Sequence, residues 1–253
     1  MQISPLVFRV LRRHLTVFAR TWPANIMFGF IEPLLYLAAL GMGLGSYVTS
    51  VNGQSYMEFI APGLIASSAM WATASECTYD AFLRLHYQKT YQAIIATPVS
   101  LDEVVVADML YGTFKSILYG SIILAVVSLL GLVASPLALL IPLPLVLCGL
   151  VFAELALTWT SLAPNMDTFN YFFTLVITPM FLFAGIFFPV EGLPAVVQKL
   201  AWFIPLYHVV EMNRALALGH LGSSFLAHFL WLAVVAGALF PLPILLMRRR
   251  LLR

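Results

Sequence analysis

The chain has 253 residues, of which 62% are hydrophobic and 9% are charged, with a net charge of +2. An ordinary soluble domain has about 25% charged residues. The composition therefore excludes a soluble globular protein and predicts a chain whose main solvent is lipid, and it gives no sign of binding to nucleic acid.

The N-terminal segment, residues 3–20, has an amphipathic helical pattern. Apolar side chains occupy one face of the predicted helix. The other face carries arginines: Arg9, Arg12, Arg13 and Arg20. This pattern is typical of a helix that lies in the membrane surface with its arginines toward acidic head groups. Pro23 is expected to mark the change of direction into the bilayer.

Apolar runs of membrane-spanning length follow, each meeting the requirement of about 20 residues. The expected spans are 24–48, 57–79, 104–132, 137–162, 169–188 and 225–247. The second and third begin with capping boxes, Ser55 with Glu58 and Ser100 with Glu103, in which the serine and the glutamate satisfy free backbone N–H groups. We predict an all-α integral membrane protein with six transmembrane helices in a single domain, residues 1–253.

The most polar stretch, "RLHYQKTYQAIIATPVSLDE", lies between the second and third spans. Its pattern predicts a short helix over residues 83–97, which ends because Pro98 disfavours helical geometry at Thr97. The side chains expected to be available on it are Arg84, His86, Tyr87, Lys89, Thr90 and Tyr91. Tyrosine and arginine are enriched at protein interfaces. From the pattern alone, this helix either binds a partner or only covers the end of the bundle.

Residues 189–224 contain two short apolar helices separated at Pro205. Each is too short to cross a bilayer, so we expect them to be interfacial or re-entrant helices on the outer face, before the last span.

The distribution of lysine and arginine predicts the orientation. The N-terminal segment, the 80–103 loop and the C-terminal "RRRLLR" carry most of these residues, whereas the opposite side has only Lys199 and Arg214. The positive-inside rule then places both termini and the predicted helix 83–97 in the cytoplasm.

Several charged residues fall within or beside the predicted spans. The acidic ones of interest are Glu32, Glu76, Asp80 and Glu154. A charge at the bilayer centre costs about 2.5–3.5 kcal/mol on insertion scales. Glu76 and Glu154 are either a proton relay or polar substrate contacts, or else buried hydrogen-bond partners between spans, and we favour the second interpretation. Asp108 and Lys115 are seven residues apart, so they share one face of the third span.

Sequence motifs for catalysis and cofactors are missing. The chain has no G-x-x-x-x-G-K-[ST], H-E-x-x-H or G-x-S-x-G, the motifs of the P-loop, of zinc proteases and of serine hydrolases. Cys77 and Cys148 lie far apart in apolar runs. We therefore expect no catalytic residue, metal or cofactor on this chain.

A family resemblance accompanies these patterns. "YMEFIAPGLIASSAMWATASECTYDAF", "QKTYQAIIATPVSLDEVVVADML", "LVITPMFLFAGIFFPVEGLP" and "FIPLYHVVEMNRALALGH" resemble the permeases of type-two ABC exporters. Within that family they look like the permeases of nodulation-factor exporters, which move lipochitooligosaccharides. The resemblance covers nearly the whole chain.

The resemblance implies a permease subunit that pairs with a second copy of itself and with two copies of an ATP-binding-cassette ATPase, which would hold ATP and Mg. Residues 83–97 match the family's coupling helix, and residues 3–20 match its membrane-surface elbow. Spans one and five match the dimer walls, where Gly41, Gly43 and Gly45 would permit close packing.

The implied function is export of an amphipathic cargo, such as a lipo-oligosaccharide, a glycolipid or a hydrophobic drug, across a bacterial inner membrane. The alternative is a proton-coupled secondary transporter that uses Glu76, Asp80 and Glu154.

Overall fold

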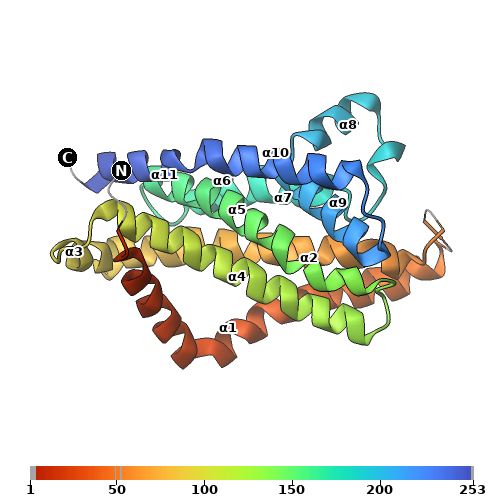
Figure 1. Cartoon of the computed structure of the whole chain (residues 1–253), viewed down its shortest axis with the longest axis horizontal. Helices are drawn as coiled ribbons and strands as arrows, with labels where there is room; N and C mark the ends of the chain where they lie inside the picture. The colour runs from red at the N-terminus through yellow and green to blue at the C-terminus, as the bar shows by residue number, and fades with distance from the viewer. Residues whose placement is uncertain (1–3, 49, 52, 252–253) are drawn as a thin grey trace.

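The computed structural model describes residues 4–48, 50–51 and 53–251. Its helices run back and forth along one long axis (Figure 1). Within the described residues, the one β-type contact is an isolated bridge between Val51 and Gln54. The all-α class is confirmed.

Helix α1 runs from Val7 to Gly43 and contains Pro23 and Pro33. The predicted surface helix and first span are thus one continuous helix, and Figure 1 shows the sharp bend between its two halves. Proline explains a bend without a loop, because it lacks an N–H donor and its ring displaces the preceding turn. Residue 3 lies outside the described residues.

In the next part of the chain, a long helix contains two π-helical turns. The elements are α2 (Tyr56–Ser75), the π-helical turns η2 (Glu76–Asp80) and η3 (Leu83–Tyr87), α3 (Thr90–Ile95) and α4 (Leu101–Leu129). Both predicted capping boxes are present, at Ser55 with Glu58 and at Ser100 with Glu103. These local signals therefore located the starts of α2 and α4.

The C-terminal half contains shorter pieces. They are η4 (Pro136–Leu140), α5 (Pro142–Leu162), α6 (Thr168–Phe172), η5 (Phe173–Ile177), α7 (Thr178–Phe183), η6 (Val190–Gly192), α8 (Ala195–Trp202), α9 (Pro205–Leu218), α10 (Ser223–Leu239) and α11 (Pro241–Leu251). The two predicted short helices are α8 and α9, and Pro205 begins the second. The π-helical turn η5 directly precedes α7, whose first turn contains Pro179.

Three helical stretches in the described residues are long and apolar enough to cross a membrane: 101–129, 136–162 and 223–251. The stretches 33–46 and 168–183 are apolar but shorter. The protein therefore has the helices of a membrane protein, and the count of six spans stays a prediction.

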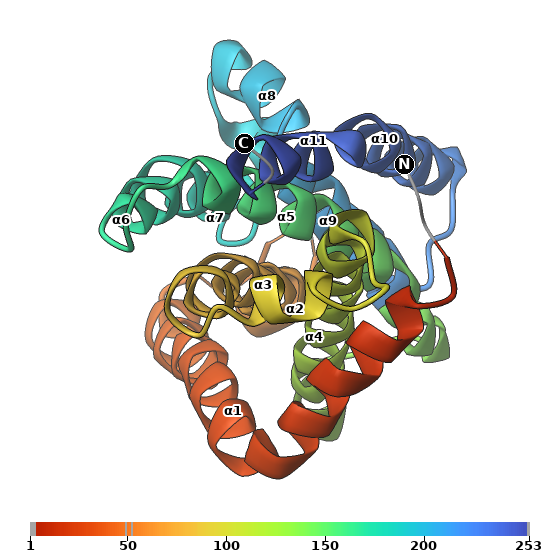
Figure 2. The ribbon, with the colours of Figure 1, turned by 90° about the vertical axis from the view of Figure 1, so that its left-hand side faces the viewer.

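Helices α2, α4 and α5 form the centre of the bundle, with α1, α6–α7 and α10–α11 around them (Figure 2). The contact of α4 with α5 is close because Gly149 faces Thr113. A Cβ atom on Gly149 would lie 2.6 Å from the Thr113 Cα atom. Ser116 Oγ also donates to the Leu145 carbonyl oxygen at 2.8 Å.

The start of α1, α3 and the end of α11 lie at one end of the bundle, and α8 lies toward the other (Figure 1). The segments that carry most of the positive charge are thus gathered at one end.

Candidate functional site

The turn between α2 and α4 is not the single helix predicted over residues 83–97. It consists of η3, a left-handed residue at Lys89 with φ 51°, and the short helix α3. The Gln88 N–H donates to the Leu83 carbonyl oxygen at 2.9 Å, which closes a π turn. The chain then changes direction at Lys89, so helical spacing carried across this point places side chains on the wrong face.

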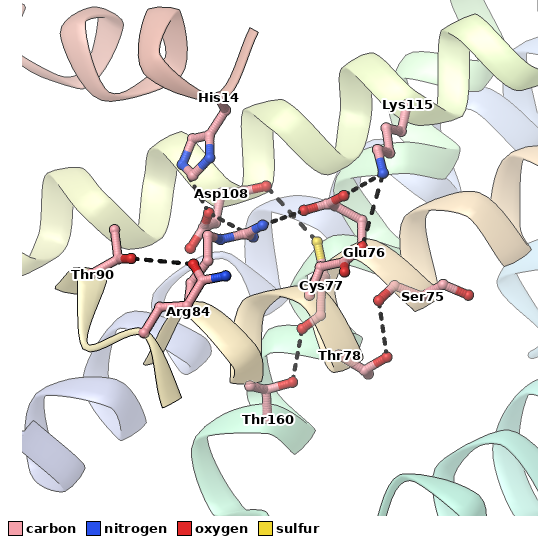
Figure 3. Close-up of polar contacts among 12 residues, drawn as sticks. His14, Ser75, Glu76, Cys77, Thr78, Arg84, Thr90, Asp108, Lys115 and Thr160 are labelled. Carbon is pink, nitrogen blue, oxygen red and sulfur yellow. Dashed lines mark hydrogen bonds and ion pairs between the residues drawn. The ribbon is translucent and has the colours of Figure 1, made fainter. Parts of the chain in front are cut away.

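Arg84 points into the bundle (Figure 3). Its Nη1 lies 2.6 Å from Glu76 Oε1, and its Nη2 lies 3.1 Å from Asp108 Oδ1. The side chain is 11% exposed. The expectation that Arg84 is available to a partner is therefore wrong, because two buried carboxylates hold it inside.

Tyr91 is the second correction. Its side chain is buried, and its hydroxyl donates to Asp108 Oδ2. Burial, together with the neighbouring Asp108 carboxylate, raises the pKa of Tyr91 well above its ordinary value, so the hydroxyl stays protonated and remains a donor. Arg84 and Tyr91 together attach both pieces of this turn to α4.

His14 joins the same carboxylate from the first half of α1. Its Nε2 lies 3.1 Å from Asp108 Oδ1 (Figure 3), and its ring stacks on Tyr111 at 5.1 Å. The sequence reasoning missed this residue. The sequence feature that could have identified His14 is its spacing from Val7 and Val10, which places all three on one helical face. All three are buried against the bundle.

Lys115 extends the network along α4. Its Nζ forms an ion pair with Glu76 and lies 4.0 Å from Asp80 Oδ2. Asp108 and Lys115, which share a helix face, are thus connected through Arg84 and Glu76. We call the set His14, Glu76, Asp80, Arg84, Tyr91, Asp108 and Lys115 the ion network.

The ion network contains two of the four predicted intramembrane acidic residues. Glu154 is 1% exposed, and its Oε2 has no hydrogen-bond partner in the described part of the chain. No ion pair or hydrogen bond between described residues joins it to the network. The side chain of Glu32 lies outside the described residues. Glu76 pairs with Arg84 of η3 and with Lys115 of α4, whereas the role of Glu154 stays a prediction.

The remaining side chains of the predicted partner surface lie outward. His86, Tyr87 and Lys89 are exposed, and Thr90 is half-buried. His86 stacks on the buried Phe82 at 5.3 Å. These residues form an exposed surface on the turn. Contacts of Arg84 and Tyr91 with Asp108 hold the buried side of the same turn against α4. In the described residues, no group of three or more histidine, cysteine, aspartate or glutamate side chains is placed to hold a metal ion.

Comparison with known proteins identifies the family. Residues 5–218 match the family described as ABC-2 type transporter. The chain belongs to this family.

Three relatives illustrate the breadth of the match. Nodulation protein J of Rhizobium leguminosarum bv. trifolii is 40% identical over 245 residues, which cover 96% of this chain and 93% of that protein. Nodulation protein J of Rhizobium meliloti (strain 1021) is 37% identical over 248 residues, with coverage of 96% and 93%. The inner membrane transport permease YadH of Escherichia coli (strain K12) is 27% identical over 198 residues, with coverage of 78% and 77%. The resemblance drawn from the motifs is confirmed.

The elbow of this ABC-2 chain keeps its predicted polar face. Its four arginines, Arg9, Arg12, Arg13 and Arg20, are exposed. Val7 and Val10 are buried against the bundle, whereas the apolar side chain of Val17 is 51% exposed. Their contact with lipid head groups stays a prediction.

The glycines near the end of α1 differ from one another. A Cβ atom on the buried Gly41 would lie 2.5 Å from Met57 Cγ, so Gly41 permits a close approach of α2 in the same chain. This packing within the chain replaces the predicted role of Gly41 in packing between two copies. Gly43 is exposed, with no atom within 4 Å of a Cβ built on it, and Gly45 lies 3.8 Å from Tyr56 Cβ. The role of these two in a dimer stays a prediction.

Proposed function

We propose that this ABC-2 chain is the permease subunit of an exporter that moves an amphipathic cargo across a bacterial inner membrane. The cargo class is a lipo-oligosaccharide, another glycolipid or a hydrophobic drug. Energy comes from ATP hydrolysis on a partner subunit. The family match and the relatives named Nodulation protein J and inner membrane transport permease support this class of function.

The observation that carries the proposal is the anchoring of the turn between α2 and α4. The Asp108 carboxylate contacts Arg84 of η3, Tyr91 of α3 and His14 of α1. Exposed side chains of the same turn, Tyr87 among them, lie free for a partner. A force applied to that surface would therefore move α4 and the first half of α1 together with the turn.

The complete assembly has two copies of this chain and two ATPase subunits that hold ATP and Mg. In it, the chain crosses the membrane six times with both termini in the cytoplasm. The placement of the first half of α1 and of α11 at one end supports this orientation, because their arginines would then share the positive side.

The cargo path and dimer contact lie along α1 and α6–α7. Both elements present large apolar side chains at the surface: Ile31, Leu35, Met42, Tyr171, Leu175 and Leu182. Between them Tyr36 contacts Phe181, with ring centroids 5.7 Å apart. A second copy or an acyl chain would cover this surface.

Reconstitution with the cognate ATPase tests the proposal. Lys89→Glu reverses an exposed charge on the turn, so it is expected to abolish stimulation of ATPase activity by the permease and to stop export. Lys199→Glu reverses an exposed charge on α8 and is the matched control. Full stimulation and export by Lys89→Glu would refute the role of this surface.

The alternative is a proton-coupled transporter, favoured by one observation, the unpartnered buried carboxyl oxygen of Glu154. Transport that continues without ATP, collapses with the proton gradient and is lost in Glu154→Gln would establish it. ATP-dependent transport in the Glu154→Gln variant would exclude it.

A further inference from the structure

Three consecutive arginines near the end of α11 have different partners. Arg248 forms an ion pair with Asp102. Its Nε donates to Oδ1 at 2.6 Å, and its Nη2 donates to Oδ2. Arg249 and Arg250 form no ion pair with a carboxylate in the described residues. Two positive charges therefore stand close together without a neutralising group from this part of the chain.

Arg250 is held in a fixed position. Its Nη1 donates to the Thr160 carbonyl oxygen at 2.6 Å, and its guanidinium carbon lies 5.5 Å from the ring centroid of the buried Phe82. A carbonyl oxygen accepts a hydrogen bond without neutralising the cation. Other N–H groups of this guanidinium remain for a ligand, because the group has five donors.

An open pocket of about 400 Å³ lies beside these arginines. It is lined by residues 161–164 at the end of α5 and by Leu246, Arg249 and Arg250 of α11. Figure 2 shows α5 and α11 side by side at this end of the bundle. Leu162 is 63% exposed, so apolar surface adjoins the two cations.

We propose that this pocket binds the phosphate head group of an anionic phospholipid. The guanidinium fork matches the oxygens of a phosphate, and basic pockets between membrane helices are typical sites for anionic lipids. The acyl chain would lie along Leu162 and the outward-facing Leu245, which is 52% exposed. The inference depends on the chain lying in a membrane and not on export.

Native mass spectrometry of the purified full chain, titrated with phosphatidylglycerol, tests the site. Arg249→Gln and Arg250→Gln are each expected to weaken binding about fivefold, and the double variant more than either, since one basic residue near an anionic lipid contributes about that much. Lys199→Gln removes an exposed charge from α8 and is expected to leave binding unchanged. Phosphatidylcholine with the same acyl chains is expected to bind more weakly.

Two further measurements complete the test. One shows whether weaker binding reflects the pocket or a loss of folding, and the other shows whether the ligand is a lipid or free phosphate. Leu162→Glu keeps both arginines and is expected to repel the lipid, whereas Leu139→Glu, at a residue 79% exposed on η4, is not. Inorganic phosphate at equal concentration is expected to leave phosphatidylglycerol bound. Unchanged binding in the double arginine variant, equal weakening by Lys199→Gln, or displacement by inorganic phosphate would each overturn the proposal.

Discussion

Arg84 and Asp108 belong to different elements, η3 and α4, and their ion pair of 3.1 Å closes the turn between α2 and α4 over the bundle. Asp108 is fully buried; it also accepts a hydrogen bond from the Tyr91 hydroxyl and lies within ion-pair distance of His14. One carboxylate thus holds three segments, and the stability of the turn depends on its charge.

Asp108→Asn is expected to lower the free energy of unfolding by about 3 kcal/mol, because removing one partner leaves a buried charge without full compensation. Glu191→Gln, on an exposed carboxylate of η6, is the control and is expected to have no effect. Chemical or thermal unfolding of the purified chain measures both. Equal stability of Asp108→Asn and Glu191→Gln would show that the network contributes nothing net.

The two ends of the Glu76–Lys115 ion pair are expected to differ in cost. Glu76→Gln leaves Arg84 and Lys115 both short of a carboxylate, whereas Lys115→Met leaves Glu76 still paired with Arg84 at 2.6 Å. Glu76→Gln should therefore lower the unfolding midpoint further than Lys115→Met. A larger loss in Lys115→Met would mean that Arg84 alone does not compensate Glu76.

The sequence predicted the parts of this region that depend on local signals. The capping boxes at Ser55 and Ser100 and the helix start at Pro205 need only neighbouring residues, and each lies where expected. The inward position of Arg84 could not be predicted in this way. Two π turns and the left-handed residue Lys89 change the helical phase between residues 76 and 90.

Contacts between segments that are distant in the sequence also could not be predicted from residue spacing. His14 meets Asp108 because α1 bends back against α4, and helical periodicity within either segment does not state which partner it faces. The spacing of Asp108 and Lys115 correctly placed them on one face, but their link through Arg84 and Glu76 comes from the tertiary fold.

Tyr91→Phe and Tyr87→Phe form a matched pair. Tyr91 is 1% exposed and donates to Asp108, whereas Tyr87 is 61% exposed. Loss of a hydrogen bond to a charged group costs about 1.5–3 kcal/mol, so Tyr91→Phe should destabilise the chain, and Tyr87→Phe should change its stability by less than about 0.5 kcal/mol. Denaturant titration compares them. The same small change in both would place the Tyr91 hydroxyl outside the network.

Gly149→Ala and Gly43→Ala test the close packing of α4 and α5. An added Cβ atom at Gly149 meets the Thr113 backbone, whereas Gly43 has open space. Overpacking typically costs about 1–3 kcal/mol, so Gly149→Ala should lower the unfolding midpoint and Gly43→Ala should not. A loss of dimer in Gly43→Ala with normal stability would support its predicted role between copies.

Acid is expected to weaken the contact of α9 with α10. The pKa of His208 is lowered to about 4, chiefly by burial; its hydrogen bond to the Trp202 carbonyl oxygen raises this pKa, and the nearby His228 lowers it. His208 Nδ1 lies 2.7 Å from His228 Nδ1. The folded chain therefore binds fewer protons at His208 than the unfolded chain, so its contribution to stability is complete above pH of about 6.5 and is lost as the pH falls toward 4.

Unfolding midpoints at pH 7 and pH 5 for the parent chain and for His208→Asn measure this contribution. The parent should lose more stability between the two values than the variant, because asparagine does not titrate. The comparison is made as a difference between chains, so carboxyl groups that titrate in both cancel. An identical loss in the two chains would mean that the His208–His228 contact tolerates the added proton.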